Sequence, residues 1–168
     1  MKRCLRFAVW IAIAIALGFC LRTYVLGTSR VLGTSMQPTL KPNDIVLITK
    51  YSYWFSSPSR GDVALCYLPN RESTYVKRVV AVPGDTFEIR DGSSYLNGEI
   101  LQEGYAVDTQ LCPDYAVTLD AGEYLVLGDN RPESYDSRAS DVGVLSEEDF
   151  IGRARMVVWP FDRFRGLD

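Results

Sequence analysis

A serine and a lysine are the residues of this chain that could together carry out hydrolysis. The 168-residue sequence contains no histidine, which excludes Ser-His-Asp and Cys-His catalysis, HExxH zinc sites and imidazole proton shuttles. A serine nucleophile then needs another base, and a lysine kept neutral by burial is the plausible candidate. Ser35 and Lys77 are the residues of interest, although a serine in a Gly-Thr-Ser loop is also typical of an ordinary turn.

Lys77 lies in the middle of a predicted strand over residues 75–82, where successive side chains point to opposite faces. Lys77 and the neighbouring Arg78 each share a face with three apolar residues: Tyr75, Val79 and Ala81 for the lysine, and Val76, Val80 and Val82 for the arginine. Alternation therefore does not decide which cation is buried. Only the lysine could act as a base, because arginine stays protonated.

A polar segment over residues 128–138 needs a separate explanation. It is not a calcium loop, because Arg131 occupies a ligand position and glycine is missing from the sixth position after Asp129. Its acids and arginines instead predict a polar network with an Asp136–Arg138 ion pair. A hydroxyl of this segment could orient a neutral lysine amine.

Composition excludes several other classes of protein. The chain is 47% hydrophobic and 23% charged with a formal net charge of -3, which predicts a packed domain and no nucleic-acid partner. Cys66 and Cys112 could form a disulfide outside the cytoplasm but need not. No CxxC pair is present, so a metal knuckle is not expected.

The N-terminus predicts a membrane anchor. Residues 1–6 are basic and are expected to stay in the cytoplasm, residues 7–26 to form a transmembrane signal anchor, and residues 27–168 an extracytoplasmic domain. The alternative is a cleaved secretory signal, because Ala14-Ile15-Ala16 imitates a cleavage site. That site lies inside the apolar run, which favours an uncleaved anchor in the cell membrane.

The remaining sequence predicts a mainly β fold, with an antiparallel, barrel-like catalytic domain after the one N-terminal transmembrane helix. A Gly, Ser and Thr-rich connector is expected over residues 27–35. Strands are expected over residues 45–49, 63–68, 75–82, 86–90, 124–127 and 155–159. Asp91-Gly92 and Asn97-Gly98 predict tight hairpins, and residues 146–149 predict one short helical turn.

Five consecutive residues, 51–55, read Tyr-Ser-Tyr-Trp-Phe. One interpretation is core filling. The other is contact with lipid headgroups, where Trp and Tyr are favoured.

Four segments, in this order, resemble the sequence boxes of type I signal peptidases, the membrane-anchored serine proteases that remove signal peptides. The N-terminus also resembles that family's anchor, so the resemblance covers most of the chain. The matched segments are Ser35-Met36-x-Pro38-Thr39-Leu40, Arg60-Gly61-Asp62-Val63, Tyr75-Val76-Lys77-Arg78-Val79 with Pro83-Gly84-Asp85, and Gly128-Asp129-Asn130-Arg131 with Ser134, Asp136, Ser137 and Arg138.

The resemblance implies that Ser35 attacks the scissile carbonyl, Lys77 acts as general base and Ser134 orients the lysine amine. It implies structural support from six further residues: Arg78, Asp129, Asn130, Arg131, Asp136 and Arg138. Some members carry an oxyanion-donating serine where this chain has Gly33, so the backbone N–H of Ser35 is the remaining candidate donor. Neither a metal nor a cofactor is expected.

The resemblance also implies the partners: preproteins bearing signal peptides, cut after small residues in an Ala-x-Ala pattern, and a lipid bilayer. An extended peptide suits strand addition, with shallow pockets for alternate side chains. Five residues match wall positions of those pockets: Val31, Met36, Leu40, Val46 and Val76.

Two alternatives remain open from the sequence. A related Ser/Lys protease could mature a single secreted, conjugation or organelle membrane protein, and would fail on most precursors. A catalytically silent, membrane-tethered assembly factor would not need both Ser35 and Lys77. The sequence does not indicate an oligomeric state.

Overall fold

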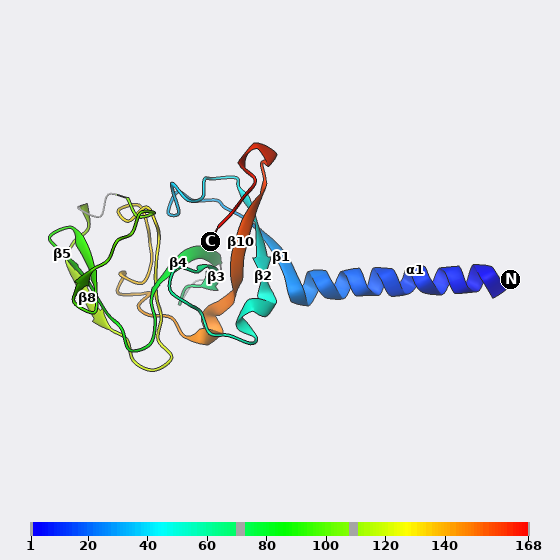
Figure 1. The fold of residues 1–168 in the computed structure, drawn as a ribbon, viewed down its shortest axis with the longest axis horizontal. Coiled ribbons are helices and arrows are strands. Elements are labelled where there is room, and N and C mark those ends of the chain that lie inside the picture. Colours follow the sequence, from blue (N-terminus) through cyan, green and yellow to red (C-terminus); the bar gives the residue numbers. More distant parts are fainter. Residues whose placement is uncertain (1, 70–72, 108–110, 168) are drawn as a thin grey trace.

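The computed structural model describes residues 2–69, 73–107 and 111–167, and shows a β domain with one helix projecting from it (Figure 1). A seven-stranded sheet has the order β1-β2-β10-β3-β4-β9, with β11 also paired to β10. Its strands are β1 Leu26–Arg30, β2 Ile45–Thr49, β3 Val63–Tyr67, β4 Thr74–Ala81, β9 Leu125–Leu127, β10 Phe150–Trp159 and β11 Arg165–Gly166. All strand pairs in it are antiparallel.

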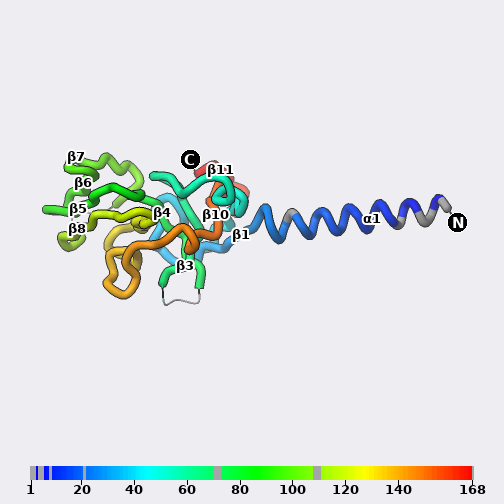
Figure 2. The backbone as a smooth tube through the Cα atoms, turned by 90° about the horizontal axis from the view of Figure 1, so that it is seen from below, coloured from blue at the N-terminus to red at the C-terminus, as the bar shows by residue number. Residues whose placement is uncertain are grey.

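A four-stranded antiparallel sheet, order β7-β6-β5-β8, forms the far end of the domain (Figure 2). Its strands are β5 Thr86–Arg90, β6 Ser93–Leu96, β7 Glu99–Ile100 and β8 Tyr115–Thr118. Asp91 and Gly92 have φ of 50° and 73°, and Asn97 and Gly98 have φ of 54° and 83°. Consecutive positive φ values are those of hairpin turns, so both predicted hairpins are confirmed.

The N-terminal helix differs from the expected span. Helix α1 covers Lys2–Cys20, a π-helical turn η1 covers Leu21–Val25, and β1 begins at Leu26. Leu26 pairs with Thr49 of β2, so strand pairing ends the helical segment before residue 26. Among the described residues, the length and apolarity needed to cross a bilayer are not met together by any helix.

Most predicted strands form within two residues of their expected bounds, but β10 begins five residues earlier than expected. Strands β1, β6, β7, β8 and β11 were not predicted. The short turn is present as the 3-10 helix η4, Glu147–Asp149, whose Ser146 forms a capping box with Asp149. Cys20, Cys66 and Cys112 are free thiols, so no disulfide joins Cys66 to Cys112.

The aromatic segment, residues 51–55, has one aromatic side chain packed against the core and others that are exposed, so neither core filling nor headgroup contact describes all of it. It forms the 3-10 helix η2, Lys50–Tyr53, and the residues just after it. Tyr53 packs edge-on against Phe150 at a centroid distance of 5.7 Å, whereas Trp54 and Phe55 are exposed. Another 3-10 helix, η5 Phe161–Arg163, precedes β11.

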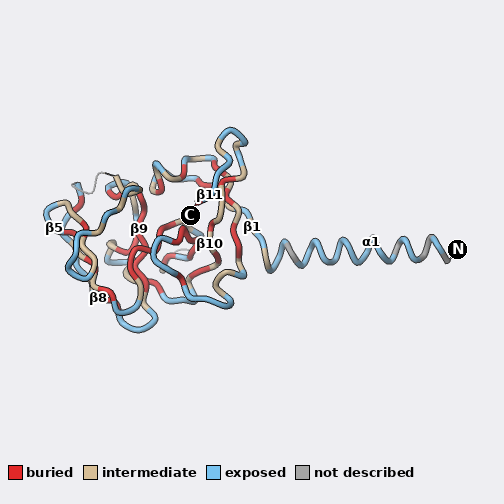
Figure 3. The backbone as a smooth tube through the Cα atoms, in the orientation of Figure 1, coloured by how far each residue is buried: buried red, intermediate tan, exposed pale blue. Residues whose placement is uncertain are grey.

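Strand β4 positions both candidate cations, and its residues 77–81 are all buried. Figure 3 shows that buried backbone lies in the interior of the domain, whereas helix α1 is exposed. Val79 packs into a core cluster with Ala64, Cys66 and Val126, while Val80 packs into another beside the second sheet. Lys77 is 2% exposed and Arg78 6%. The question left open by alternation is therefore answered: both cations are buried, on opposite faces.

Candidate active site

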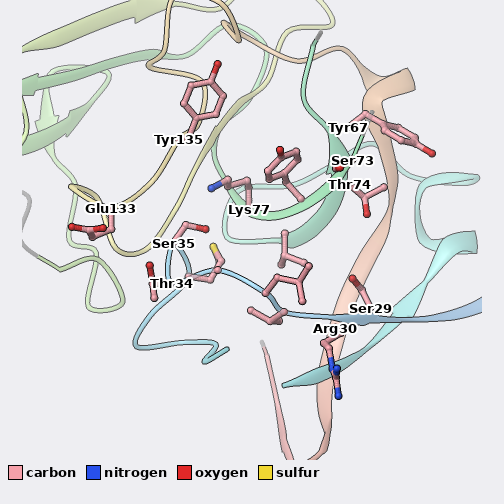
Figure 4. A pocket seen from close by; sticks show the side chains of 16 residues that line it. Ser29, Arg30, Thr34, Ser35, Tyr67, Ser73, Thr74, Lys77, Glu133 and Tyr135 are labelled. Atoms are coloured by element: carbon pink, nitrogen blue, oxygen red, sulfur yellow. The ribbon is translucent and has the colours of Figure 1, made fainter. Parts of the chain in front are cut away.

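An open cleft of about 760 Å³ brings Ser35 and Lys77 together. Its walls are residues 29–36 on one side and residues 73–77 on the other, with Tyr67, Glu133 and Tyr135 at its rim (Figure 4). Figure 4 shows the side chains of Ser35 and Lys77 on facing sides of one space. Residues far apart in the sequence therefore share one accessible cavity.

The amine of Lys77 is held by one specific hydrogen bond. Its Nζ donates to Oγ of Ser134 at 2.9 Å. Burial lowers the pKa of Lys77 below its ordinary value, and the negative charge of Asp136 opposes this effect. The result is a lysine biased towards the neutral form that a base requires.

Asp136 and Arg138 form the predicted ion pair behind Ser134. Arg138 donates to both carboxylate oxygens, from Nε at 2.8 Å and from Nη2 at 2.8 Å. Burial alone would raise the pKa of Asp136, but hydrogen bonds from Arg138 and Ser134 hold it below the usual value. Because Ser134 donates its hydroxyl proton to Asp136, its oxygen is free to accept from Lys77.

The loop carrying Ser35 is fixed from two sides. The backbone N–H of Asn130 donates to the Ser35 carbonyl at 2.9 Å, and the Asn130 side chain donates to the Thr34 carbonyl at 3.3 Å. Leu40 N–H donates to Met36 O at 2.7 Å, closing the turn that follows the serine. Ser35 itself is partly exposed, so a molecule bound in the open cleft can reach its hydroxyl.

Arg78 and Asp129 join the two predicted blocks beneath the cleft. Arg78 donates to the two Asp129 oxygens from Nε and Nη2, each at 2.8 Å. Its Nη1 donates to the Gly61 carbonyl at 2.9 Å, which ties in the Arg60-Gly61-Asp62 segment. Asp129 also accepts a short hydrogen bond from the Thr39 hydroxyl, so this carboxylate links β4 to the serine loop.

Gly128 occupies a position that no other residue could take. A Cβ there would overlap Ser134 Oγ and the Ser35 carbonyl oxygen. The glycine therefore allows the loop after β9 to pass directly between the serine loop and Ser134.

The expected pocket residues occupy two layers. Val31, Met36 and Val76 line the cleft. Leu40 and Val46 are 0% exposed and pack behind them in the same core cluster, so they support the wall and do not form its surface.

Three residues of the site carried no assigned role in the sequence analysis. Thr39 lies in a recognised block, but nothing in the spacing indicates its bond to Asp129. Glu103 and Tyr105 come from the segment after β7, and contact Arg131 and Arg78 respectively. No local pattern marks them, because their partners are at least 27 residues away in sequence.

A serine hydroxyl and a buried lysine amine that line one cleft of a mainly β domain are the groups that a histidine-free serine hydrolase needs. The family model for "Signal peptidase, peptidase S26" matches residues 4–159. The chain therefore belongs to the peptidase S26 family of signal peptidases.

Individual relatives agree with this assignment. The chain is 35% identical over 168 residues to signal peptidase I of Leptolyngbya laminosa, covering 94% of this chain and 80% of the relative. It is 32% identical to signal peptidase I of Bacillus licheniformis, with 94% and 90% covered. The crystal structure of a signal peptidase I from Enterococcus faecalis superimposes with a TM-score of 0.51 at 30% identity, covering 58% of this chain and 97% of that chain.

Proposed function

We propose that the protein is a serine endopeptidase that removes signal peptides from exported preproteins, with Ser35 as nucleophile and Lys77 as general base. The observation that carries this proposal is the buried Lys77 amine, held at 2.9 Å from Ser134 Oγ in the cleft that also contains Ser35. A neutral amine has two N–H groups and one lone pair. With one N–H engaged by Ser134, the lone pair is available to the Ser35 hydroxyl.

The reaction follows from these positions. Lys77 accepts the Ser35 proton as Oγ bonds to the scissile carbonyl carbon. The resulting ammonium gives that proton to the leaving amine as the C–N bond breaks, which leaves an acyl ester on Ser35. A water that Lys77 deprotonates then hydrolyses the ester and restores both groups.

The developing oxyanion needs a hydrogen-bond donor. Because Gly33 has no side-chain donor, we assign this role to the backbone N–H of Ser35. The Asn130 contacts with the Ser35 and Thr34 carbonyls hold this backbone in place before substrate arrives. Such preorganisation lets a single backbone donor contribute without a cost of reorientation.

An open strand edge supports the expected mode of substrate binding. Strand β9 pairs with β4 only from Arg78 onwards, so among the described strands the edge of residues 74–77 that faces away from β3 has no partner. An extended peptide can pair there while its alternate side chains meet Val31, Met36 and Val76. Shallow apolar walls favour small residues such as alanine, mainly by excluding larger ones.

Membrane attachment is the part of the proposal that concerns α1. Its large apolar side chains are exposed, including Phe7, Trp10 and Phe19 at 69% each. Exposed apolar surface of this extent favours contact with lipid. We place the N-terminus in the cytoplasm and the domain from residue 27 outside it, as the basic start predicts. Proteolysis of right-side-out vesicles should remove the domain, and protection of the domain would contradict this orientation.

Cleavage of several unrelated preproteins tests the enzymatic assignment. The full chain in detergent or lipid should cut after Ala-x-Ala, and Ser35→Ala and Lys77→Ala should each abolish cutting while circular dichroism is unchanged. Ser73→Ala, a second serine lining the same cleft, is the matched control for Ser35→Ala. A wild type that cuts only one precursor would indicate a dedicated maturation protease, and full activity of Lys77→Ala would refute the lysine base.

A further inference from the structure

Glu103 is a buried carboxylate whose contacts lead to the catalytic loop. Its side chain is 4% exposed and forms an ion pair at 2.5 Å with Arg131, whose side chain is 0% exposed. The Tyr105 hydroxyl donates to the same Glu103 oxygen at 2.9 Å. A charge this deeply buried is stable only when it is paired. The pair therefore fixes the position of Arg131.

Arg131 transmits this constraint to the residues that orient Lys77. Its Nε donates to the Gly128 carbonyl at 3.0 Å, and its own carbonyl accepts from Arg138 Nη2 at 2.6 Å. Gly128 lies directly against Ser134 Oγ, and Arg138 also holds Asp136. Arg131 thus braces both sides of the turn that presents Ser134 to Lys77.

The segment containing Glu103 also touches the other half of the site. Arg78 lies over the Tyr105 ring at 3.9 Å from its centroid, a cation–π geometry. Val107 N–H donates to the Asp129 carbonyl at 2.9 Å. Residues 103–107 therefore form a strap, running from the second sheet across the two arginines under the cleft.

We propose that Glu103 is a positioning residue for catalysis: by fixing Arg131 it holds Gly128 and Ser134 so that the Lys77 amine faces Ser35. Glu103 does not touch the reacting atoms and is proposed to act through Arg131. The inference rests on the proposed function of Lys77 as the base. It adds a residue outside the recognised blocks to the machinery of the site.

A double-mutant cycle in the full chain tests this coupling. Glu103→Gln should lower kcat about 10- to 100-fold, the cost of small misplacements of catalytic groups, with KM changed less than about twofold because the substrate walls are untouched. In a Ser134→Ala background the same substitution should change kcat by less than about threefold, since the group it positions is gone. Equal losses in both backgrounds would overturn the proposal.

Two further variants separate positioning from folding. Tyr105→Phe removes only the 2.9 Å hydrogen bond to Glu103 and keeps the ring beneath Arg78, so it should fold and should lower kcat about threefold or more. Glu88→Gln is the matched control, because Glu88 is only partly buried and pairs with the exposed Arg90 at 3.6 Å on the second sheet. It should leave kcat unchanged. If Tyr105→Phe and Glu103→Gln both retain wild-type kcat, the proposal is wrong.

A titration of Lys77 by NMR reads the same positioning without cleavage. The chain has four lysines, so a ¹³C-lysine spectrum is simple, and Lys77→Met assigns the signal. The ionisable groups acting on Lys77 are Asp136, Cys66, Arg138 and Asp129. Glu103→Gln should move the titration of Lys77 towards the ordinary lysine range as solvent reaches the amine, whereas Glu88→Gln should not.

The cleavage assay and the Lys77 titration distinguish a failure of the proposed function from a failure of the positioning proposal. A wild type inert on every preprotein, with the Lys77 titration still moved by Glu103→Gln, would refute the proposed function and leave the positioning intact. An active wild type whose Lys77 titration ignores Glu103→Gln would refute the positioning alone.

Discussion

Replacing Asp129 by asparagine should be one of the most damaging single changes in the domain. Asp129 is 0% exposed, and its two oxygens accept hydrogen bonds from Arg78 at 2.8 Å each. Asparagine keeps the size but removes the charge, so the Arg78 guanidinium, 8% exposed as a side chain, would stay buried without its counter-ion. Breaking one half of a buried ion pair costs about 3–5 kcal/mol.

That loss is large compared with the whole free energy of unfolding of a typical domain, about 5–15 kcal/mol. Activity per folded molecule should fall as well, because the Thr39 hydroxyl that fixes the serine loop donates to the same carboxylate. Urea unfolding of the full chain in detergent, followed by circular dichroism, measures the first effect, and preprotein cleavage at low denaturant the second.

The control for Asp129→Asn is Glu88→Gln, which removes a partly exposed ion pair and should cost about 0–1 kcal/mol. If Asp129→Asn also costs less than about 1 kcal/mol, then Arg78 does not depend on this carboxylate. The account of how β4 is tied to the serine loop would then be wrong.

The remaining predictions concern the base, the loop after β9 and metals. Because burial lowers the pKa of Lys77, kcat/KM should rise with pH through a midpoint below the ordinary lysine range, and a profile flat down to acid pH contradicts a lysine base. Between the pKa of Lys77 in the folded chain and its pKa in the unfolded chain, the unfolded chain binds more protons. The free energy of unfolding should therefore rise with pH across that window. Lys77→Met should remove this rise, which is measured by urea unfolding at successive pH values. Gly128→Ala should abolish cleavage, since the new Cβ would overlap Ser134 Oγ and the Ser35 carbonyl, whereas Gly18→Ala, with open space around it, should not. EDTA should leave cleavage unchanged, and a chelator-sensitive activity would contradict a reaction carried by serine and lysine alone.

The sequence predicts the elements whose signals are local. Strands such as β2 and β5 form at their expected bounds because each is a short run of β-favouring residues preceded by a turn signal, at residues 41–44 and 83–85. Strand β1 was missed because Gly27, Thr28 and Ser29 read as a connector, and only pairing with β2 makes them a strand. Its pairing also sets the end of the helical segment at Val25.

The candidate site, like the fold, could be predicted from the sequence only in part. Ser35, Lys77 and Ser134 could be proposed from residue types and blocks, but their approach depends on β3, β9 and the loop at Gly128. The burial of Lys77 could not be predicted, because alternation gave it and Arg78 equally apolar neighbours. Both are buried since β4 lies between two core clusters, a property of the sheets and not of the strand.

A neutral Lys77 is favoured by the pairing of the buried carboxylates near it with arginines. Burial lowers the pKa of Lys77, but an unpaired carboxylate close to it would favour the ammonium and cancel that effect. The structure provides three pairs instead: Asp129 with Arg78, Asp136 with Arg138 and Glu103 with Arg131. Arginine suits this role because it stays protonated when buried and cannot compete with Lys77 as a base. The polar network is therefore what allows desolvation to prevail at the lysine.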